Sequence, residues 1–396
     1  MIARRIIFFS HSSELSGAPK CLLELVESIE RSRYLPIVVT PEKGPLIQGL
    51  RKVNVEVKII KGIERLSIQN RNPVLKLFFL WRRTLLNFYL TFQTYRLIRE
   101  YKADLVYLNS IASRYAGVSA KISGLPVIWH IHEGYQNKFK RWFFSLLIGW
   151  IATKVIFNSE ANRTLWGYEK LIRKSTCVYN GIDLKNVEDL RQKKIEIDFK
   201  NAKPFIGYIG QINPFKGINI LIDAMGKIRL RFSDATCWII GKPSPNQEGY
   251  YEMLKEKVIQ KGLEQNIKFI GFQPNIFPLI DKIDILVMPS LFEAFGRVLI
   301  EGMALAKPIV ASRVGGIPEI VVDYETGILV PPNDPQKLAE AILSLLEDPV
   351  LRRRLGETGQ KRVKEFFTLE NYLIKIESVM GELLEHKPKW KRPDQS

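Results

Sequence analysis

Residues 283–301 read IDILVMPSLFEAFGRVLIE, and this stretch carries the pattern of a strand followed by a helix. The apolar run that ends at Ser290 is short enough for a buried strand. A loop with Glu293 and Gly296 follows, and we expect a helix from there through Glu301. Gly296 permits the backbone to approach a ligand closely. The stretch therefore predicts one strand–loop–helix unit of an α/β fold.

Short apolar runs alternate with longer amphipathic stretches on both sides of this unit. This order favours parallel sheets that are covered by helices on both faces. Two series of strands are expected. The first covers residues 6–10, 36–40, 55–60, 105–108, 127–131 and 155–158, and the second covers residues 205–210, 237–241, 267–271, 285–289, 308–311 and 327–330.

The two series predict two doubly wound, Rossmann-like domains that face each other across a cleft, since 396 residues suffice for two cores. We expect an N-terminal domain at 1–185, a polar linker at 186–203 and a C-terminal domain at 204–365. A helix at 366–386 is expected to pack back on the N-terminal domain, and a basic disordered tail is expected at 387–396.

The chain has a net charge of +18, and its first half carries most of it. Residues 1–180 hold 28 Lys and Arg against 12 Asp and Glu, a balance of +16, whereas the remainder balances at +2. A basic half indicates an anionic partner, which is a membrane surface, a phosphorylated lipid or nucleic acid.

Cysteine usage favours a cytoplasmic location. Cys21, Cys177 and Cys237 form no CxxC pair and no zinc spacing, which suits a reducing compartment. The start, MIARRIIFFS, predicts a buried strand rather than a signal peptide. The longest apolar stretch, at 142–151, would span ~15 Å as a helix, too little to cross a bilayer. With the basic half, this predicts a cytoplasmic protein that is peripheral on the inner face of the cell membrane.

The start of the helix after Gly296 offers unpaired N–H groups and a positive dipole end, which suit a phosphate. Glu293 and Glu301 would then hold hydroxyl groups on either side of that phosphate, as the layout of a nucleotide sugar requires. The alternative is plainer, because Glu293 would then only complement the dipole and Glu301 would be a solvated side chain.

The wider context of these residues resembles a known family. Glu293-x7-Glu301 is followed by GMALAKPIVAS at 302–312 and GGIPE at 315–319. With NGID at 180–183, GQINPFKG at 210–217 and GILVPPND at 327–334, it resembles the retaining glycosyltransferases of the GT-B fold, family four, often called group 1. The resemblance covers residues 175–345 and is weaker before them. It implies that the first domain binds the acceptor and the second binds the nucleotide sugar.

The resemblance assigns roles to individual residues. It implies that Glu293 contacts hydroxyls of the donor sugar and that Glu301 binds the ribose. Lys216 matches the lysine that neutralises the diphosphate, a role that suits a compact cation; its alternative is a solvated lysine at a helix start. The donor diphosphate and sugar would also meet the backbone around Phe295, Gly296, Arg297 and Val298.

One position departs from the family pattern. Gln211 stands where the family usually has an arginine, after the glycine that ends the first strand of the second domain. A neutral amide brings no charge to the diphosphate, so we hypothesise that Arg297 partly replaces the arginine. The alternative is that Arg297 is an exposed arginine at a helix start.

In the first half, Gly17 follows the first strand and matches the glycine-bearing loop that borders the donor diphosphate in this family. The expected strand at 127–131 is followed by His132 and Glu133. The family has a histidine near the reacting sugar at this strand end, and His132 matches it better than His130. Alternation along a strand places both histidines on one face, so both could border the cleft. The alternative is a histidine satisfied by local backbone.

The resemblance implies a retaining, same-face reaction in which the leaving phosphate helps to deprotonate the acceptor. The catalytic residues would be His132, Lys216 and Glu293. No DxD motif occurs in the chain, so we expect a metal-independent transferase with no cofactor besides the nucleotide-sugar donor, most often UDP-linked.

Aromatic and basic residues are concentrated at 76–99 and 138–144. Such stretches can hold a helix at an anionic bilayer, which would suit a lipid-linked acceptor in cell-surface polysaccharide or glycolipid synthesis. The alternative is a pair of ordinary helices whose aromatic side chains face the core.

Two other function classes are compatible with parts of the sequence. A GT-B nucleotide-sugar epimerase would need no acceptor and would release an altered UDP-sugar. A nucleic-acid-binding protein would rest on charge alone, because no zinc finger or RNA-binding signature is present, and we expect no nucleic-acid partner.

Overall fold

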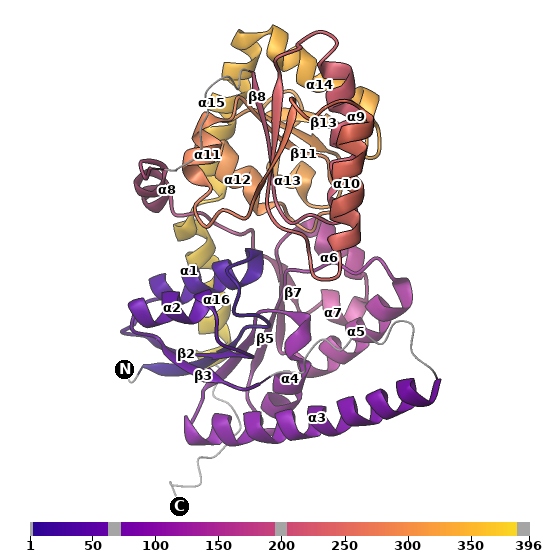
Figure 1. Cartoon of the computed structure of the whole chain (residues 1–396). Coiled ribbons are helices and arrows are strands. Elements are labelled where there is room, and N and C mark those ends of the chain that lie inside the picture. The colour runs from indigo at the N-terminus through magenta and orange to yellow at the C-terminus, as the bar shows by residue number, and fades with distance from the viewer. Residues whose placement is uncertain (1–2, 62–72, 195–203, 386–396) are drawn as a thin grey trace, which may run out of the picture. The chain divides into compact units, whose positions relative to one another are not determined.

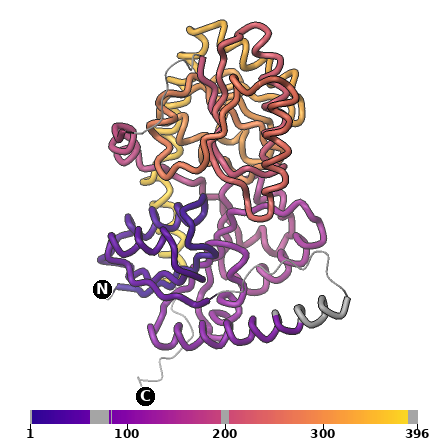
Figure 2. Tube along the Cα trace, in the orientation of Figure 1, coloured from indigo at the N-terminus to yellow at the C-terminus, as the bar shows by residue number. Residues whose placement is uncertain are grey.

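The computed structural model describes residues 3–61, 73–194 and 204–385, with the side chains of all of these except 73–80 and 83. The chain divides into two compact units. The first comprises Met1–Tyr179 and Tyr372–Ser396, and the second comprises Asn180–Asn371. Each unit is built round one sheet with helices on both faces (Figures 1 and 2). The expected tail at 387–396 lies outside the described residues.

The first unit contains a seven-stranded sheet of order β3-β2-β1-β4-β5-β6-β7, and every neighbouring pair of strands is parallel. The strands are β1 (Arg4–Phe9), β2 (Tyr34–Thr40), β3 (Glu56–Ile59), β4 (Leu105–Leu108), β5 (Val127–Ile131), β6 (Lys154–Phe157) and β7 (Ser175–Cys177). The first six lie where the apolar runs predict them. Strand β7 was not predicted, because its three residues form no apolar run.

Beside this sheet, helix α4 packs against both α3 and α5, and helix α1 packs against α2. The helical elements of the first unit are α1 (Gly17–Ser28), α2 (Pro45–Lys52), α3 (Pro73–Glu100), η1 (Ile111–Ser113), α4 (Arg114–Ile122), α5 (Lys138–Ile151), α6 (Glu160–Trp166) and α7 (Glu169–Ile172). Helix α16 (Leu369–Glu385) contributes its residues from Tyr372 onward. It is joined to the unit by an ion pair of 3.4 Å between Lys154 and Glu382.

The second unit contains a six-stranded parallel sheet of order β10-β9-β8-β11-β12-β13. Its strands are β8 (Phe205–Ile209), β9 (Thr236–Ile240), β10 (Ile267–Gly271), β11 (Ile285–Met288), β12 (Ile309–Ser312) and β13 (Gly327–Val330). Its helical elements are α8 (Leu184–Arg191), η2 (Pro214–Lys216), α9 (Ile218–Ile228), α10 (Glu248–Gln260), α11 (Phe277–Lys282), α12 (Arg297–Ala304), α13 (Ile317–Ile320), α14 (Pro335–Glu347) and α15 (Pro349–Phe366). All six strands lie where the sequence predicts them.

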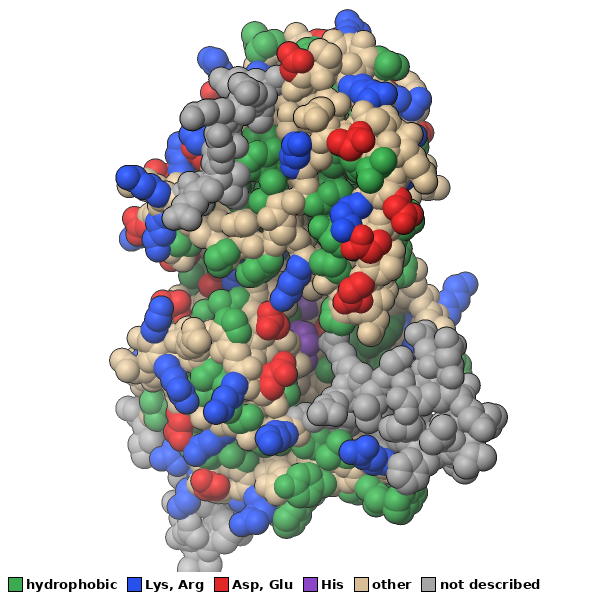
Figure 3. Space-filling view, in the orientation of Figure 1, with side chains coloured by type: hydrophobic (Ala, Val, Ile, Leu, Met, Phe, Trp, Pro, Cys, Tyr) green, Lys and Arg blue, Asp and Glu red, His purple; other side chains and the backbone are tan. Residues whose placement is uncertain are grey.

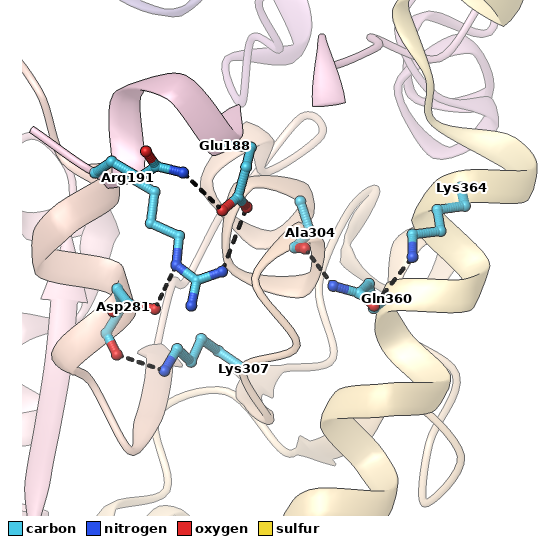
Figure 4. Close-up of polar contacts among 8 residues, drawn as sticks. Glu188, Arg191, Asp281, Ala304, Lys307, Gln360 and Lys364 are labelled. Carbon is cyan, nitrogen blue, oxygen red and sulfur yellow. Dashed lines mark hydrogen bonds and ion pairs between the residues drawn. The ribbon is translucent and has the colours of Figure 1, made fainter. Parts of the chain in front are cut away.

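A helix, α8, stands where the linker was expected to begin. Asp183 caps it, because its carboxylate accepts hydrogen bonds from the backbone N–H groups of Lys185 and Asn186. Arg191 then pairs with Asp281 of α11 at 2.9 Å (Figure 4). Charged residues that suggested a polar linker therefore cap a helix and form an ion pair within the second unit. Residues 195–203 lie outside the described residues.

Each sheet has one point at which strand order reverses, between β1 and β4 in the first unit and between β8 and β11 in the second. The loops that leave the carboxyl ends of two such strands separate to opposite sides and leave a crevice, where open α/β sheets bind ligands. A site is therefore expected at the loops after β1, β4, β8 and β11. In the described part of the chain, no helix combines the length and the hydropathy that a membrane span needs.

Candidate functional site

The loop after β8 positions Lys216. Residues 214–216 form one helical turn, which Asn213 caps by accepting a hydrogen bond from the Phe215 N–H at 3.1 Å. The Leu291 N–H, in the loop after β11, donates to the Phe215 carbonyl at 2.8 Å. This bond ties together the two loops that flank the reversal point of the sheet.

The Lys216 ammonium group lies 2.5 Å from Oε2 of Glu293, across these two loops. The lysine side chain is 24% exposed and the glutamate side chain 14% exposed. A charge-assisted hydrogen bond between partly buried groups is stronger than one between solvated groups. The alternative reading of Lys216 as a solvated lysine is therefore wrong.

The GGIPE segment holds the backbone of Glu293 in place. The Gly316 N–H donates a hydrogen bond of 3.1 Å to the Glu293 carbonyl oxygen. Gly315 has φ of +51°, and a Cβ atom on it would lie 1.8 Å from the same oxygen. Only glycine fits there, because any side chain would collide with the peptide that carries Glu293.

Helix α12 begins at the end of the same loop. Gly296 precedes it with φ of +100° and, as a glycine, has no side chain of its own with which to cap the helix. The positive end of the helix dipole suits an anionic group. Phe295 is buried and packs edge-on against Phe367 at 6.1 Å, which fixes the loop, while Val298 in the first turn is half-buried.

The other end of α12 is also anchored. Gln360 of α15 donates a hydrogen bond of 2.8 Å to the carbonyl oxygen of Ala304, the last residue of α12, and Lys364 supports Gln360 (Figure 4). A helix that is held at its C-terminus by α15 keeps its N-terminus in a constant direction.

Arg297 and Glu301 pair on α12, with the guanidinium Nε 3.3 Å from Oε1. Their side chains are only 10% and 6% exposed. The alternatives that Arg297 is an exposed arginine and that Glu301 is a solvated glutamate are therefore wrong. The pair orients the Glu301 carboxylate, because a buried carboxylate needs a partner. Gln211 is exposed, and its side-chain oxygen accepts from the Ser244 hydroxyl at 3.2 Å. The hypothesis that Arg297 compensates for Gln211 stays a prediction.

In the first unit, Asn109 connects His132 to the start of α1. The Asn109 amide nitrogen donates to the Ala18 carbonyl at 2.8 Å, so its oxygen must face Nε2 of His132, which lies 3.0 Å away. An amide oxygen only accepts, so Nε2 of His132 carries a proton. Gly17 begins α1, which no side chain caps. One partner of the His132 side chain is thus the side chain of Asn109.

His130 lies behind His132, with the ring centroids 3.9 Å apart. The prediction that both histidines lie on one face of the strand is correct. The prediction that His130 borders the cleft is wrong, because His130 is completely buried. Its Nδ1 lies 2.7 Å from the Tyr107 hydroxyl, and Tyr372 of α16 stacks on its ring. Burial lowers the pKa of His130 to about 3, so its imidazole stays neutral.

The structure brings Lys216, Glu293, Gly296, Arg297 and Glu301 together in the second unit, whereas Gly17 and His132 belong to the first. Sequence reasoning missed Asn109, although a polar residue at the carboxyl end of β4 was a usable signal. It also missed Tyr107 and Tyr372, for which the sequence offers no signal, since a tyrosine in an apolar run reads as core.

The chain is similar to known glycosyltransferases along most of its length. Residues 190–362 match the family described as glycosyl transferases group 1, and residues 15–186 match glycosyltransferase family 4. An uncharacterized glycosyltransferase of Methanocaldococcus jannaschii is 34% identical over 54% of this chain and 56% of its own length. The chain thus spans about half the length of this relative. The lipopolysaccharide core biosynthesis mannosyltransferase LpsB of Rhizobium meliloti is 26% identical over 58% of this chain and 73% of its own length.

Among solved structures, HepE of Anabaena in complex with UDP-glucose superposes with a TM-score of 0.79 over 96% of this chain and 99% of its own, at 24% identity. This likeness and the two parallel α/β units show the GT-B fold. The two regions that match family descriptions follow one another almost without a gap. The chain therefore belongs to the group 1 glycosyltransferases.

Proposed function

We propose that this chain transfers a glycosyl group, with retention of anomeric configuration, from a nucleoside diphosphate sugar to a glycan or a lipid-linked acceptor. The observation that carries the proposal is the pairing of Lys216 with Glu293 beside the glycine that precedes α12. It supplies a cation, a carboxylate and a helix dipole within two neighbouring loops, which are the groups that a diphosphate and a sugar require.

The ion pair would change partners when the donor binds. A diphosphate at the start of α12 offers Lys216 more negative charge than one carboxylate does, so the ammonium group turns to it. Glu293 then exposes its oxygens to the hydroxyls of the donor sugar. Glu301, held by Arg297 at 3.3 Å, accepts hydrogen bonds from the ribose hydroxyls.

In the reaction, the bond between the anomeric carbon and the diphosphate oxygen breaks, and the bond from the acceptor oxygen forms on the same face. The acceptor proton passes to the leaving phosphate. Lys216 and the dipole of α12 stabilise the charge that develops on the diphosphate, without a metal ion. His132 would lie near the donor sugar, as the family resemblance implies, with its Nε2 proton directed at Asn109.

The proposed nucleotide is uridine diphosphate, because HepE of Anabaena has the same fold and its crystal structures contain UDP and UDP-glucose. A cell-surface acceptor is supported by the relative in Rhizobium meliloti that is named for lipopolysaccharide core biosynthesis. An anionic inner membrane face would then be the place of reaction for a lipid-linked acceptor.

Thermal-shift screening with UDP-, GDP- and ADP-sugars tests the donor class. A ligand at a hundred times its Kd adds about 2.7 kcal/mol to the free energy of unfolding. We expect the largest shift with a UDP-sugar, its loss in Glu293→Gln, and its retention in the control Glu325→Gln, which alters an exposed carboxylate of the same unit.

Product analysis of the donor alone and with acceptors completes the test. Transfer to an acceptor with release of the nucleoside diphosphate is expected. No shift with any nucleotide sugar, or release of an altered UDP-sugar from the donor alone, would contradict the proposal.

A further inference from the structure

Helix α3 has an apolar side that is packed and an apolar side that is not. Its packed side carries Leu90, Leu97 and Ile98, which are buried, and α3 packs closely against α4. The Ser119 hydroxyl of α4 donates to the Thr91 carbonyl oxygen of α3 at 2.7 Å. These apolar contacts and this hydrogen bond hold α3 on the first unit.

The opposite side of α3 is a stripe of exposed large apolar side chains. They are Trp81 (63% exposed), Leu85 (48%), Phe88 (70%), Tyr89 (57%) and Phe92 (57%). Their spacing of four, three, one and three residues places them on one helix face. Scattered exposed apolar residues are ordinary, but a continuous stripe marks a surface that binds something.

Helix α5 repeats the arrangement. Ser145, Ile148 and Ile151 are buried on its inner side. On the outer side, the exposed aromatic residues are Phe139 (72%), Trp142 (53%), Phe143 (51%) and Trp150 (56%). The alternative from sequence, that the aromatic residues of these two helices face the core, is therefore wrong for these eight aromatic residues. We call the two stripes together the aromatic face.

The helices that carry and separate the two stripes are basic. Together α3, α4 and α5 hold ten Lys and Arg residues and one acidic residue, Glu100. The Arg96 guanidinium lies over the Phe92 ring, 6.0 Å from its centroid. Figure 3 shows Lys and Arg side chains beside hydrophobic ones in the region where Figure 1 places α3. Aromatic residues flanked by cations are what a helix at an anionic lipid interface presents.

We propose that the aromatic face binds the surface of an anionic bilayer, with the rings of α3 and α5 at the level of the acyl boundary and the basic side chains at the headgroups. Charge decides against a second copy of the chain, because two aromatic faces would bring like charges together. An anionic lipid surface is complementary to both the rings and the cations.

The proposal deepens the proposed function and rests on it in one respect. If the chain is a glycosyltransferase, a membrane-bound first unit would place its acceptor among molecules held in the same membrane. A lipid-linked acceptor then needs to diffuse only in two dimensions to reach the enzyme. Binding of the chain to lipid, however, is measured without any sugar transfer.

Co-sedimentation of the full chain with vesicles tests the proposal. The vesicles contain phosphatidylcholine alone or phosphatidylcholine with phosphatidylglycerol. The test variant is the double substitution Phe88→Ser, Phe92→Ser, and the matched control is Leu230→Ser, Ile259→Ser, which alters exposed apolar residues of the second unit (83% and 62% exposed). Donor-induced thermal shifts of all proteins are recorded in parallel.

We expect the wild type and the control to sediment with the anionic vesicles only, and more weakly at high salt. The test variant should lose at least tenfold in vesicle affinity and keep its donor-induced shift, which shows that it is folded. Wild-type binding to neither vesicle, equal binding to both, or undiminished binding of the test variant would overturn the proposal. A wild-type dimer that the test variant dissociates, without vesicle binding, would overturn it in favour of self-association. Loss of the donor shift in every protein would count against the proposed function instead.

Discussion

Replacing Gly315 by alanine tests whether the GGIPE turn positions Glu293. The new Cβ would lie 1.8 Å from the Glu293 carbonyl oxygen, and real Cβ atoms essentially never come closer than 3.0 Å to such an atom, so the peptide must move by about 1.2 Å. A misplacement of about 1 Å in a catalytic group can cost about 10²-fold in rate. The φ of +51° at this residue adds a backbone cost of about 1–2 kcal/mol.

We expect Gly315→Ala to lower kcat/KM with a UDP-sugar about 10²-fold and to lower Tm by about 2–8 °C, given the size of the unit. Gly249→Ala is the matched control, because a Cβ at that position of α10 meets nothing within 4 Å. It should keep wild-type kcat/KM and have an equal or higher Tm. Circular dichroism gives Tm, and donor turnover gives kcat/KM. A Gly315→Ala variant with lowered Tm but wild-type kcat/KM would refute the reasoning.

Four further outcomes are expected. Lys216→Ala should lower kcat by about 10²–10³-fold with partial recovery in Lys216→Arg, and wild-type kcat in both would remove the lysine from the reaction. Asn109→Ala should lower kcat/KM by about tenfold, since one hydrogen bond to His132 is lost, and steady-state kinetics would show it. Because the pKa of His130 is lowered to about 3, the unfolded state binds a proton between about pH 6.5 and pH 3 that the folded state does not. His130 should therefore lower the free energy of unfolding by about 1.4 kcal/mol for each pH unit as the pH falls from about 6.5 to about 3. Urea titrations should find this slope reduced in His130→Gln, and an unchanged slope would be inconsistent with a neutral His130. Activity should persist in EDTA, whereas abolition by EDTA and rescue by magnesium would contradict a metal-independent reaction.

The local patterns predicted the strands and the strand–loop–helix unit at 283–301 correctly. A short apolar run between polar ends is typical of a strand in a parallel sheet that helices cover on both faces, and all six expected strands of the second sheet were found. The local structure of the Glu293 to Glu301 segment was also predicted from sequence, because the strand, the glycine and the helix are neighbours in the chain. Strand β7 and helix α8 were missed, because their residues carry no apolar run.

The sequence by itself determined the two parallel α/β units and the residue types at their strand ends, because strand and helix patterns depend on neighbours a few residues apart. Only the tertiary structure decided that Lys216 pairs with Glu293, 77 residues away, since that contact depends on β8 and β11 lying side by side. It also decided that His130 is buried while His132 reaches Asn109, and that eight aromatic residues of α3 and α5 are exposed. An apolar side chain has the same hydrophobicity on either side of a helix, and the packing of that helix on its neighbours selects which side is covered.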